Sequence, residues 1–138
     1  MMAQRDGVRR GKRRKSTLAV MTKTRELATY TFVILEKAPQ KYRLTTVNRL
    51  HNYVLNAIEN IYIANRESDV EKRRMYQEKA MNNLAMTDYM GSIMLDVGCI
   101  LMNQYENISL LVGESIRLLK AWMNANNKMV STSNNEEK

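Results

Sequence analysis

Apolar residues recur every three or four positions along four stretches of the chain, which is the spacing of one face of an α-helix. In the first stretch Leu27 and Ile34 lie on such a face. Pro39 ends this stretch, because proline disfavours helical geometry at the residue before it. The pattern predicts four helices, at about residues 22–37, 46–66, 69–97 and 104–125.

Start and stop signals flank the last two predicted helices. Ser68 and Glu71 have the S-x-x-E spacing of a capping box, in which each side chain satisfies a backbone N–H at the helix start. Asn103 and Glu106 repeat the spacing, and Gly98 lies where a C-terminal stop is needed. The connections are short, and short connections make neighbouring helices antiparallel.

These elements predict an all-α protein, an antiparallel up-down-up-down four-helix bundle over residues 17–126. Residues 1–16 are charged, contain two glycines and have little to bury, so we expect a disordered basic N-terminal tail. Residues 127–138 are expected to form a second loose end.

Some apolar runs are too wide for the single face that a bundle helix buries. Residues 32–35 are apolar without interruption, and apolar side chains also dominate residues 90–102. Met86, Met90 and Met94 form a stripe at helical spacing, which is typical of an adaptable core or interface. The excess favours a homo-oligomer; the alternative is a thick core with a few exposed apolar side chains.

Charge is concentrated at the N-terminus. The chain has a net charge of +8, of which residues 1–15 carry +6. A basic arm on a nearly neutral body is typical of a protein that binds an anionic polymer, although a solubilising tail has the same composition. The candidate nucleic-acid contacts in the arm are Arg9, Arg10, Lys12, Arg13, Arg14 and Lys15.

A second group of basic residues lies around the first connection and at the start of the third predicted helix. Tyr42 and Tyr76 are interspersed with it and could stack on bases. Contacts of this kind are dominated by phosphates and depend on salt. Ordinary surface charge, partly offset by neighbouring glutamates, is the alternative. The candidate contacts here are Lys41, Arg43, Arg49, Lys72, Arg73, Arg74 and Lys79.

No catalytic constellation stands out in the sequence. His51 is the only histidine, and no partner acid or nucleophile lies at a recognised spacing from it. Cys99 is the only cysteine and lies in an apolar run, so we expect a buried thiol and a reducing, cytoplasmic location. No metal motif, phosphate loop or membrane-spanning run is present. We therefore expect neither enzymatic activity nor a cofactor, although two-carboxylate hydrolysis remains open from sequence.

The chain resembles the four-helix-bundle superfamily of 23S rRNA intervening-sequence proteins. Within that superfamily it looks most like the accessory variability determinant (Avd) proteins of diversity-generating retroelements. The resemblance covers about residues 22–125. It is carried by Ala38-Pro39-Gln40-Lys41, Leu44, Leu50, Ala57-Ile58-Glu59-Asn60-Ile61, Ala64-Asn65-Arg66, Arg74, Tyr76, Lys79-Ala80 and Arg117-Leu118-Leu119-Lys120-Ala121-Trp122.

The resemblance implies a non-enzymatic protein that assembles into a pentameric ring with a basic surface. It implies binding to the retroelement's reverse transcriptase and to template RNA, or to a hybrid of that RNA with its cDNA. Such a protein supports the error-prone cDNA synthesis of mutagenic homing. The alternative is a generic intervening-sequence-type bundle with a structural role and no polymerase partner.

Overall fold

The computed structural model describes the backbone of residues 2–136 and the side chains of residues 17–126. Within this part of the chain every regular element is a helix. The elements are α1 (Met2–Leu35), α2 (Gln40–Tyr42), the π-helical turn η1 (Arg43–Val47), α3 (Asn48–Arg66), α4 (Val70–Asp96) and α5 (Met102–Glu136).

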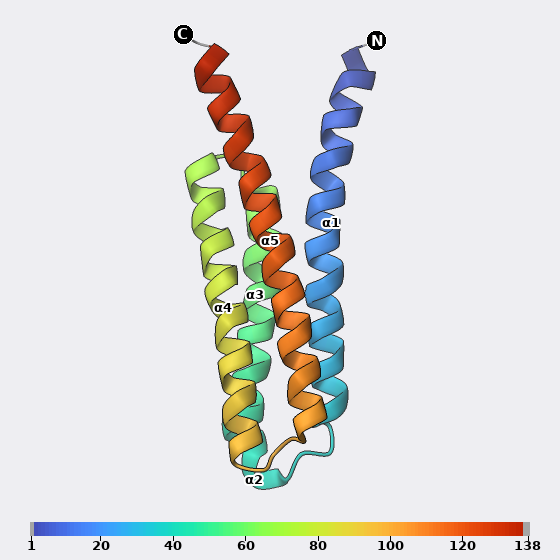
Figure 1. The fold of residues 1–138 in the computed structure, drawn as a ribbon, viewed down its shortest axis with the longest axis vertical. Coiled ribbons are helices and arrows are strands. Elements are labelled where there is room, and N and C mark those ends of the chain that lie inside the picture. Colours follow the sequence, from blue (N-terminus) through green and yellow to red (C-terminus); the bar gives the residue numbers. More distant parts are fainter. Residues whose placement is uncertain (1, 137–138) are drawn as a thin grey trace.

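The four long helices run side by side, and consecutive ones point in opposite directions (Figure 1). Both termini and the α3–α4 turn lie at one end of the bundle, called the terminal end below. Residues 36–47 and the α4–α5 turn form the opposite, far end (Figure 1). Because α1 contacts α3 and α5, and α4 contacts the same two helices, the order around the bundle is α1, α3, α4, α5. The predicted all-α, four-helix architecture is confirmed.

Each long helix contributes leucines that are completely buried. Leu27 of α1, Leu50 of α3, Leu84 of α4 and Leu119 of α5 have no exposed surface. Their sequence positions follow the apolar period that predicted the helices, because that period places them on one helical face. The burial of these faces against one another holds the bundle together.

Helix α4 is terminated as predicted by Gly98, which follows its last turn and adopts a positive φ of 78°. The N–H of Cys99 donates to the carbonyl of Met94 at 2.8 Å, and the N–H of Gly98 donates to that of Leu95 at 3.0 Å. These two bonds form a Schellman motif, which satisfies carbonyls left without partners at a helix end.

The predicted caps of the last two helices were wrong by one or two residues. The N-cap of α4 is Asp69 and not Ser68, because the Asp69 carboxylate accepts the N–H of Glu71 at 3.1 Å. At α5 the side chain of Gln104 accepts the N–H of Leu101 at 2.9 Å, where Asn103 was expected to cap. Several side chains near a helix start can accept a hydrogen bond from a free backbone N–H. Sequence spacing alone does not show which of them forms the cap.

The chain becomes helical again directly after Pro39, about six residues earlier than predicted. Proline at the N-cap position leaves the backbone free to begin α2 at Gln40. The turn η1 then joins α2 to α3 without a break. The segment η1 contains two threonines, and this polar character is why no helix was predicted there from the sequence.

The backbones of α1 and α5 extend to Met2 and Glu136, past the predicted ends of their helices (Figure 1). Residues 1–16 and 127–138 lie outside the range whose side chains are described. The expected disorder of these two ends stays a prediction.

Candidate nucleic-acid interface

Two contacts establish which side of α3 and α4 faces which neighbour. His51, which follows the buried Leu50, stacks on Phe32 of α1 with ring centroids 4.0 Å apart. Asp88, which follows the buried Thr87, accepts a hydrogen bond from Ser109 of α5 at 3.3 Å. On α3 the residue after each buried position therefore faces α1, and on α4 it faces α5. By the 100° step of a helix, the residue before each buried position lies on the side where α3 meets α4.

This side, called the α3/α4 seam below, gathers three of the predicted nucleic-acid contacts. Arg49 on α3, and Lys72 and Lys79 on α4, each come directly before a buried residue and are exposed. The structure thus places on one side of the bundle basic residues that are up to 30 positions apart in the sequence. The sequence shows that Arg49 and Lys79 precede apolar residues, but the burial of Arg73, which follows Lys72, and the neighbour of each helix side had to come from the structure.

Arg73 is not available at this surface, which corrects its assignment as a nucleic-acid contact. Its side chain is 9% exposed, and both its Nε and its Nη2 donate to the main-chain carbonyl of Glu67. Arg73 sits at a core position of α4, where only the long aliphatic stem lets its charge reach the α3–α4 turn.

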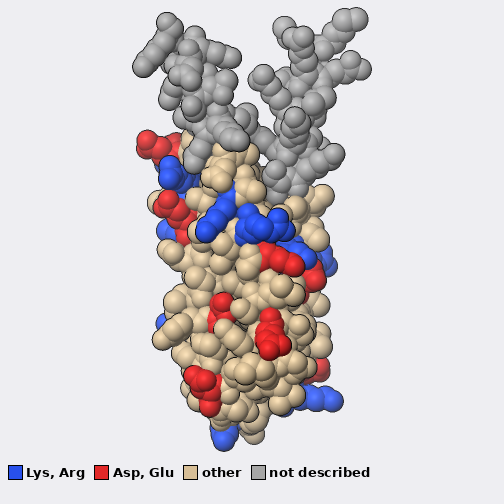
Figure 2. Space-filling view, in the orientation of Figure 1, with Lys and Arg blue, Asp and Glu red and all other residues tan. Residues whose placement is uncertain are grey.

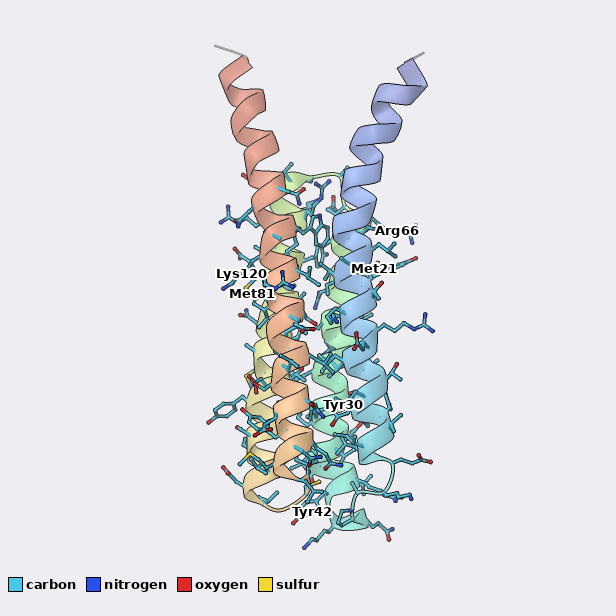
Figure 3. All side chains as sticks on the ribbon, turned by 45° about the vertical axis from the view of Figure 1, so that its right-hand side comes forward. Met21, Tyr30, Tyr42, Arg66, Met81 and Lys120 are labelled. Atoms are coloured by element: carbon cyan, nitrogen blue, oxygen red, sulfur yellow. The ribbon has the colours of Figure 1, made fainter. Side chains whose placement is uncertain are left out.

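Arg74 faces away from the seam. It follows Arg73, so it lies on the side of α4 that faces α5, and its Nε is 3.4 Å from Glu78. Arg66, at the end of α3, packs over the ring of Tyr62, 5.6 Å from its centroid. Figure 3 shows Arg66 near the terminal end, at about the level of Met21 of α1.

Lys41 and Arg43 lie at the far end, where Figure 3 shows Tyr42. Lys41 lies over the ring of Tyr42, 4.9 Å from its centroid. Arg43 donates to the carbonyls of Ala38 and Glu36 at 3.1 and 3.2 Å, so its guanidinium anchors the end of α1. The body candidates thus separate into the seam, the α5-facing side of α4 and the far end.

Charge is also divided between the two sides of the far half of the bundle. Residues 23–53, from α1 to α3, carry a net +4, whereas residues 84–114, from α4 to α5, carry −4. Figure 2 shows the face with α5 in the middle, α4 to its left and α1 to its right: Lys and Arg gather nearer the terminal end, and carboxylates dominate below them. The arm candidates Arg9, Arg10, Lys12, Arg13, Arg14 and Lys15 lie outside the described side chains.

Two titratable groups are perturbed by burial. Desolvation lowers the pKa of His51 below its ordinary value, and a backbone hydrogen bond with Thr31 opposes the shift. The Nε2 of His51 is buried without a hydrogen-bond partner. Burial likewise raises the pKa of the Cys99 thiol, which is half-buried where full burial was expected. Among the described residues, no acidic or basic side chain acts on either group in a way that would make it a nucleophile or a base.

Among residues 17–126, no three His, Cys, Asp or Glu side chains gather as a metal site would require. The described helices include none with an apolar stretch long enough to cross a membrane. The predicted methionine stripe turns from core to surface, since Met94 is fully buried and Met86 is 38% exposed.

The sequence matches no protein-family model and no curated protein. The geometry of the bundle and its basic seam therefore carries the functional argument.

Proposed function

We propose that this protein is a non-enzymatic accessory subunit of a diversity-generating retroelement. In this role it binds the reverse transcriptase and its template RNA, and it supports error-prone cDNA synthesis in the cytoplasm. The observation that carries the proposal is the α3/α4 seam, where Arg49, Lys72 and Lys79 line one side of a four-helix bundle. Such a row of cations supplies phosphate contacts that do not depend on base sequence.

The residues behind the Avd resemblance support a shared architecture. Ala57, Ile61, Ala80 and Leu119 are fully buried, and Trp122 is 3% exposed. These residues set the distances between helices, because small side chains allow close approach and large ones fill the remaining space. They favour the same bundle as the Avd proteins, and the seam adds the surface on which RNA binding depends.

Self-association into a ring, with five copies as the resemblance implies, is part of the proposal. Oppositely charged sides on one molecule favour head-to-tail contacts, and head-to-tail contacts generate rings when the rotation closes. The negative side of the far half includes a shallow hollow of about 530 Å³ on the outer face of α5. Leu110 (60% exposed) and Gly113 line this hollow, with Glu106, Glu114 and Arg117 around them.

The proposal is tested by co-expressing the full chain with the reverse transcriptase that the proposed retroelement would encode beside its gene. We expect the two proteins to co-purify, and cDNA synthesis from the template RNA to rise when this protein is added. A reverse transcriptase that neither co-purifies nor responds would contradict the proposal.

The alternative is an intervening-sequence-type bundle with a structural role. The basic seam is compatible with this alternative if its partner is a structured RNA. Neighbouring genes separate the two: a reverse transcriptase gene with a template repeat and a variable repeat supports the accessory role, and their absence supports the alternative.

A further inference from the structure

Two tyrosine rings share the α3/α4 seam with the basic residues. Tyr53 comes directly before the buried Val54, and Tyr76 directly before the buried Gln77, so both occupy the seam-facing side of their helices. Both rings are half-buried, which leaves part of each open to a ligand.

Each of these rings has a cation over it. The guanidinium of Arg49 lies 5.4 Å from the centroid of Tyr53 and donates a 3.3 Å hydrogen bond to its hydroxyl. The ammonium of Lys79 lies 5.4 Å from the centroid of Tyr76. A flat group stacked on either ring would therefore place its own anionic substituent next to a positive charge.

The seam-facing positions contain no carboxylate. Glu78 and Asp88 of α4 face α5. Glu71 lies in the first turn of α4, but it is not at a seam position. The seam instead carries amides and apolar side chains, among them Asn60, which is half-buried at about the level of Tyr76. The positions concerned are 49, 53, 56, 60 and 63 on α3, and 72, 76, 79, 83, 86, 90 and 93 on α4.

The rings follow one another along the seam. Because the short turn after Arg66 leads directly into Val70, Tyr76 lies at the level of Asn60, seven residues above Tyr53 on α3. At a rise of 1.5 Å per residue the two rings are separated by about 10 Å along the axis. Lys72 continues the row toward the terminal end, and Arg49 ends it toward the far end.

We infer that the α3/α4 seam is a track for single-stranded nucleic acid. Tyr53 and Tyr76 stack on bases, and Arg49, Lys72 and Lys79 bind the phosphates between and beside them. The inference deepens the proposed function, on which it rests, by naming the site and the form of the RNA. A duplex keeps its bases stacked on one another inside the helix, so it cannot use the rings, whereas a single strand can.

The test uses the full chain and a fluorescently labelled oligouridine, with anisotropy measured over a range of salt. Replacing both rings by leucine, Tyr53→Leu with Tyr76→Leu, keeps apolar bulk against the core but removes the π faces. We expect affinity to fall at least about tenfold, since stacking contributes about 1–3 kcal/mol per base. The pair Tyr53→Phe with Tyr76→Phe keeps both rings and should bind like the unmodified protein.

The matched control is Tyr62→Leu with Tyr89→Leu. Tyr62 lies on the side of α3 that faces α1, and Tyr89 is 63% exposed on α4 away from the seam positions. This pair should leave oligouridine binding unchanged. A second arm, Arg49→Gln with Lys79→Gln, should flatten the log–log salt slope by about 1.4, or about 0.7 for each lost contact.

Equal loss in the two leucine pairs, unchanged binding in the seam pair, or tighter binding of a duplex RNA of the same length would each overturn the track. These outcomes are separate from failure of the accessory role. A seam variant that binds oligouridine normally, in a protein that still stimulates the reverse transcriptase, removes the track and leaves the proposed function standing.

Discussion

Arg73 binds the main-chain carbonyl oxygen of Glu67 through two guanidinium atoms, Nε at 3.0 Å and Nη2 at 2.8 Å. Glu67 is the C-cap residue of α3, so this arginine of α4 closes the turn between the two helices. We expect Arg73→Met to lower the free energy of unfolding by about 2–3 kcal/mol, because hydrogen bonds from charged groups contribute about 1.5–3 kcal/mol. Urea titration measures the change.

Arg74→Met is the control for Arg73→Met. Its ion pair with Glu78 is exposed on both partners, and such pairs contribute about 0–1 kcal/mol. A larger loss for Arg74→Met than for Arg73→Met would show that the turn does not depend on the buried guanidinium.

The sequence predicted the number of helices and their core faces, because burial is periodic and the period can be read directly. Leu50, Leu84 and Leu119 follow the apolar period of their helices and are fully buried. The basic residues were harder to place. Arg73 and Arg74 are neighbours in the sequence, yet one closes a buried turn and the other pairs on the surface.

The seam could be predicted only in part. Tyr76 was already a candidate for stacking, and Arg49 and Lys79 precede the apolar residues Leu50 and Ala80. Lys72 and Tyr76 precede Arg73 and Gln77, whose polar side chains gave no sign of their burial. Tyr53 was not a candidate for stacking, because nothing in the sequence says that this side of α3 meets α4. That assignment needed the Phe32–His51 and Asp88–Ser109 contacts.

Gly98 and Gly113 should respond to alanine with opposite signs. Gly98 has a φ of 78°, and nothing lies within 4 Å of an added Cβ, so the cost of Gly98→Ala is conformational, about 1–2 kcal/mol. Gly113 is helical and equally open, so Gly113→Ala should stabilise by about 0.5–1 kcal/mol. Thermal unfolding measures both changes, and losses of equal size would contradict the Schellman assignment.

His51 should make stability depend on pH in a defined window. Burial lowers its pKa in the folded state below the ordinary value of about 6.5. Above that pH the side chain is neutral in both states, so its burial does not make the free energy of unfolding depend on pH. As the pH falls below it, the unfolded chain binds a proton that the folded chain does not, so stability decreases until the folded pKa is reached.

His51→Phe keeps a ring stacked on Phe32 and removes the titrating group. We expect its free energy of unfolding to change less between about pH 6.5 and 5 than that of the unmodified protein. Chemical denaturation across this range measures the difference. Parallel curves for the two proteins would show that the folded pKa is not lowered.

Reversing charge on the negative side of the far half should break self-association. Asp96 and Glu106 are exposed in the −4 segment, and the +4 segment of a neighbouring copy would face them in a head-to-tail ring. We expect Asp96→Lys with Glu106→Lys to give a smaller species, measured by size-exclusion chromatography with light scattering. Glu36→Lys, which adds charge to the side that is already positive, is the control and should assemble normally.

Charge exchange gives the sharper form of this prediction. Lys37→Glu and Lys41→Glu, added to Asp96→Lys with Glu106→Lys, leave both segments with zero net charge but let the new glutamates pair with the new lysines across the contact, so assembly should return. Because the partners are exposed, raising the salt concentration should weaken the contact in both the original and the restored protein. A single mass for all variants, or a monomer for the unmodified chain, would mean that the divided charge serves a different partner.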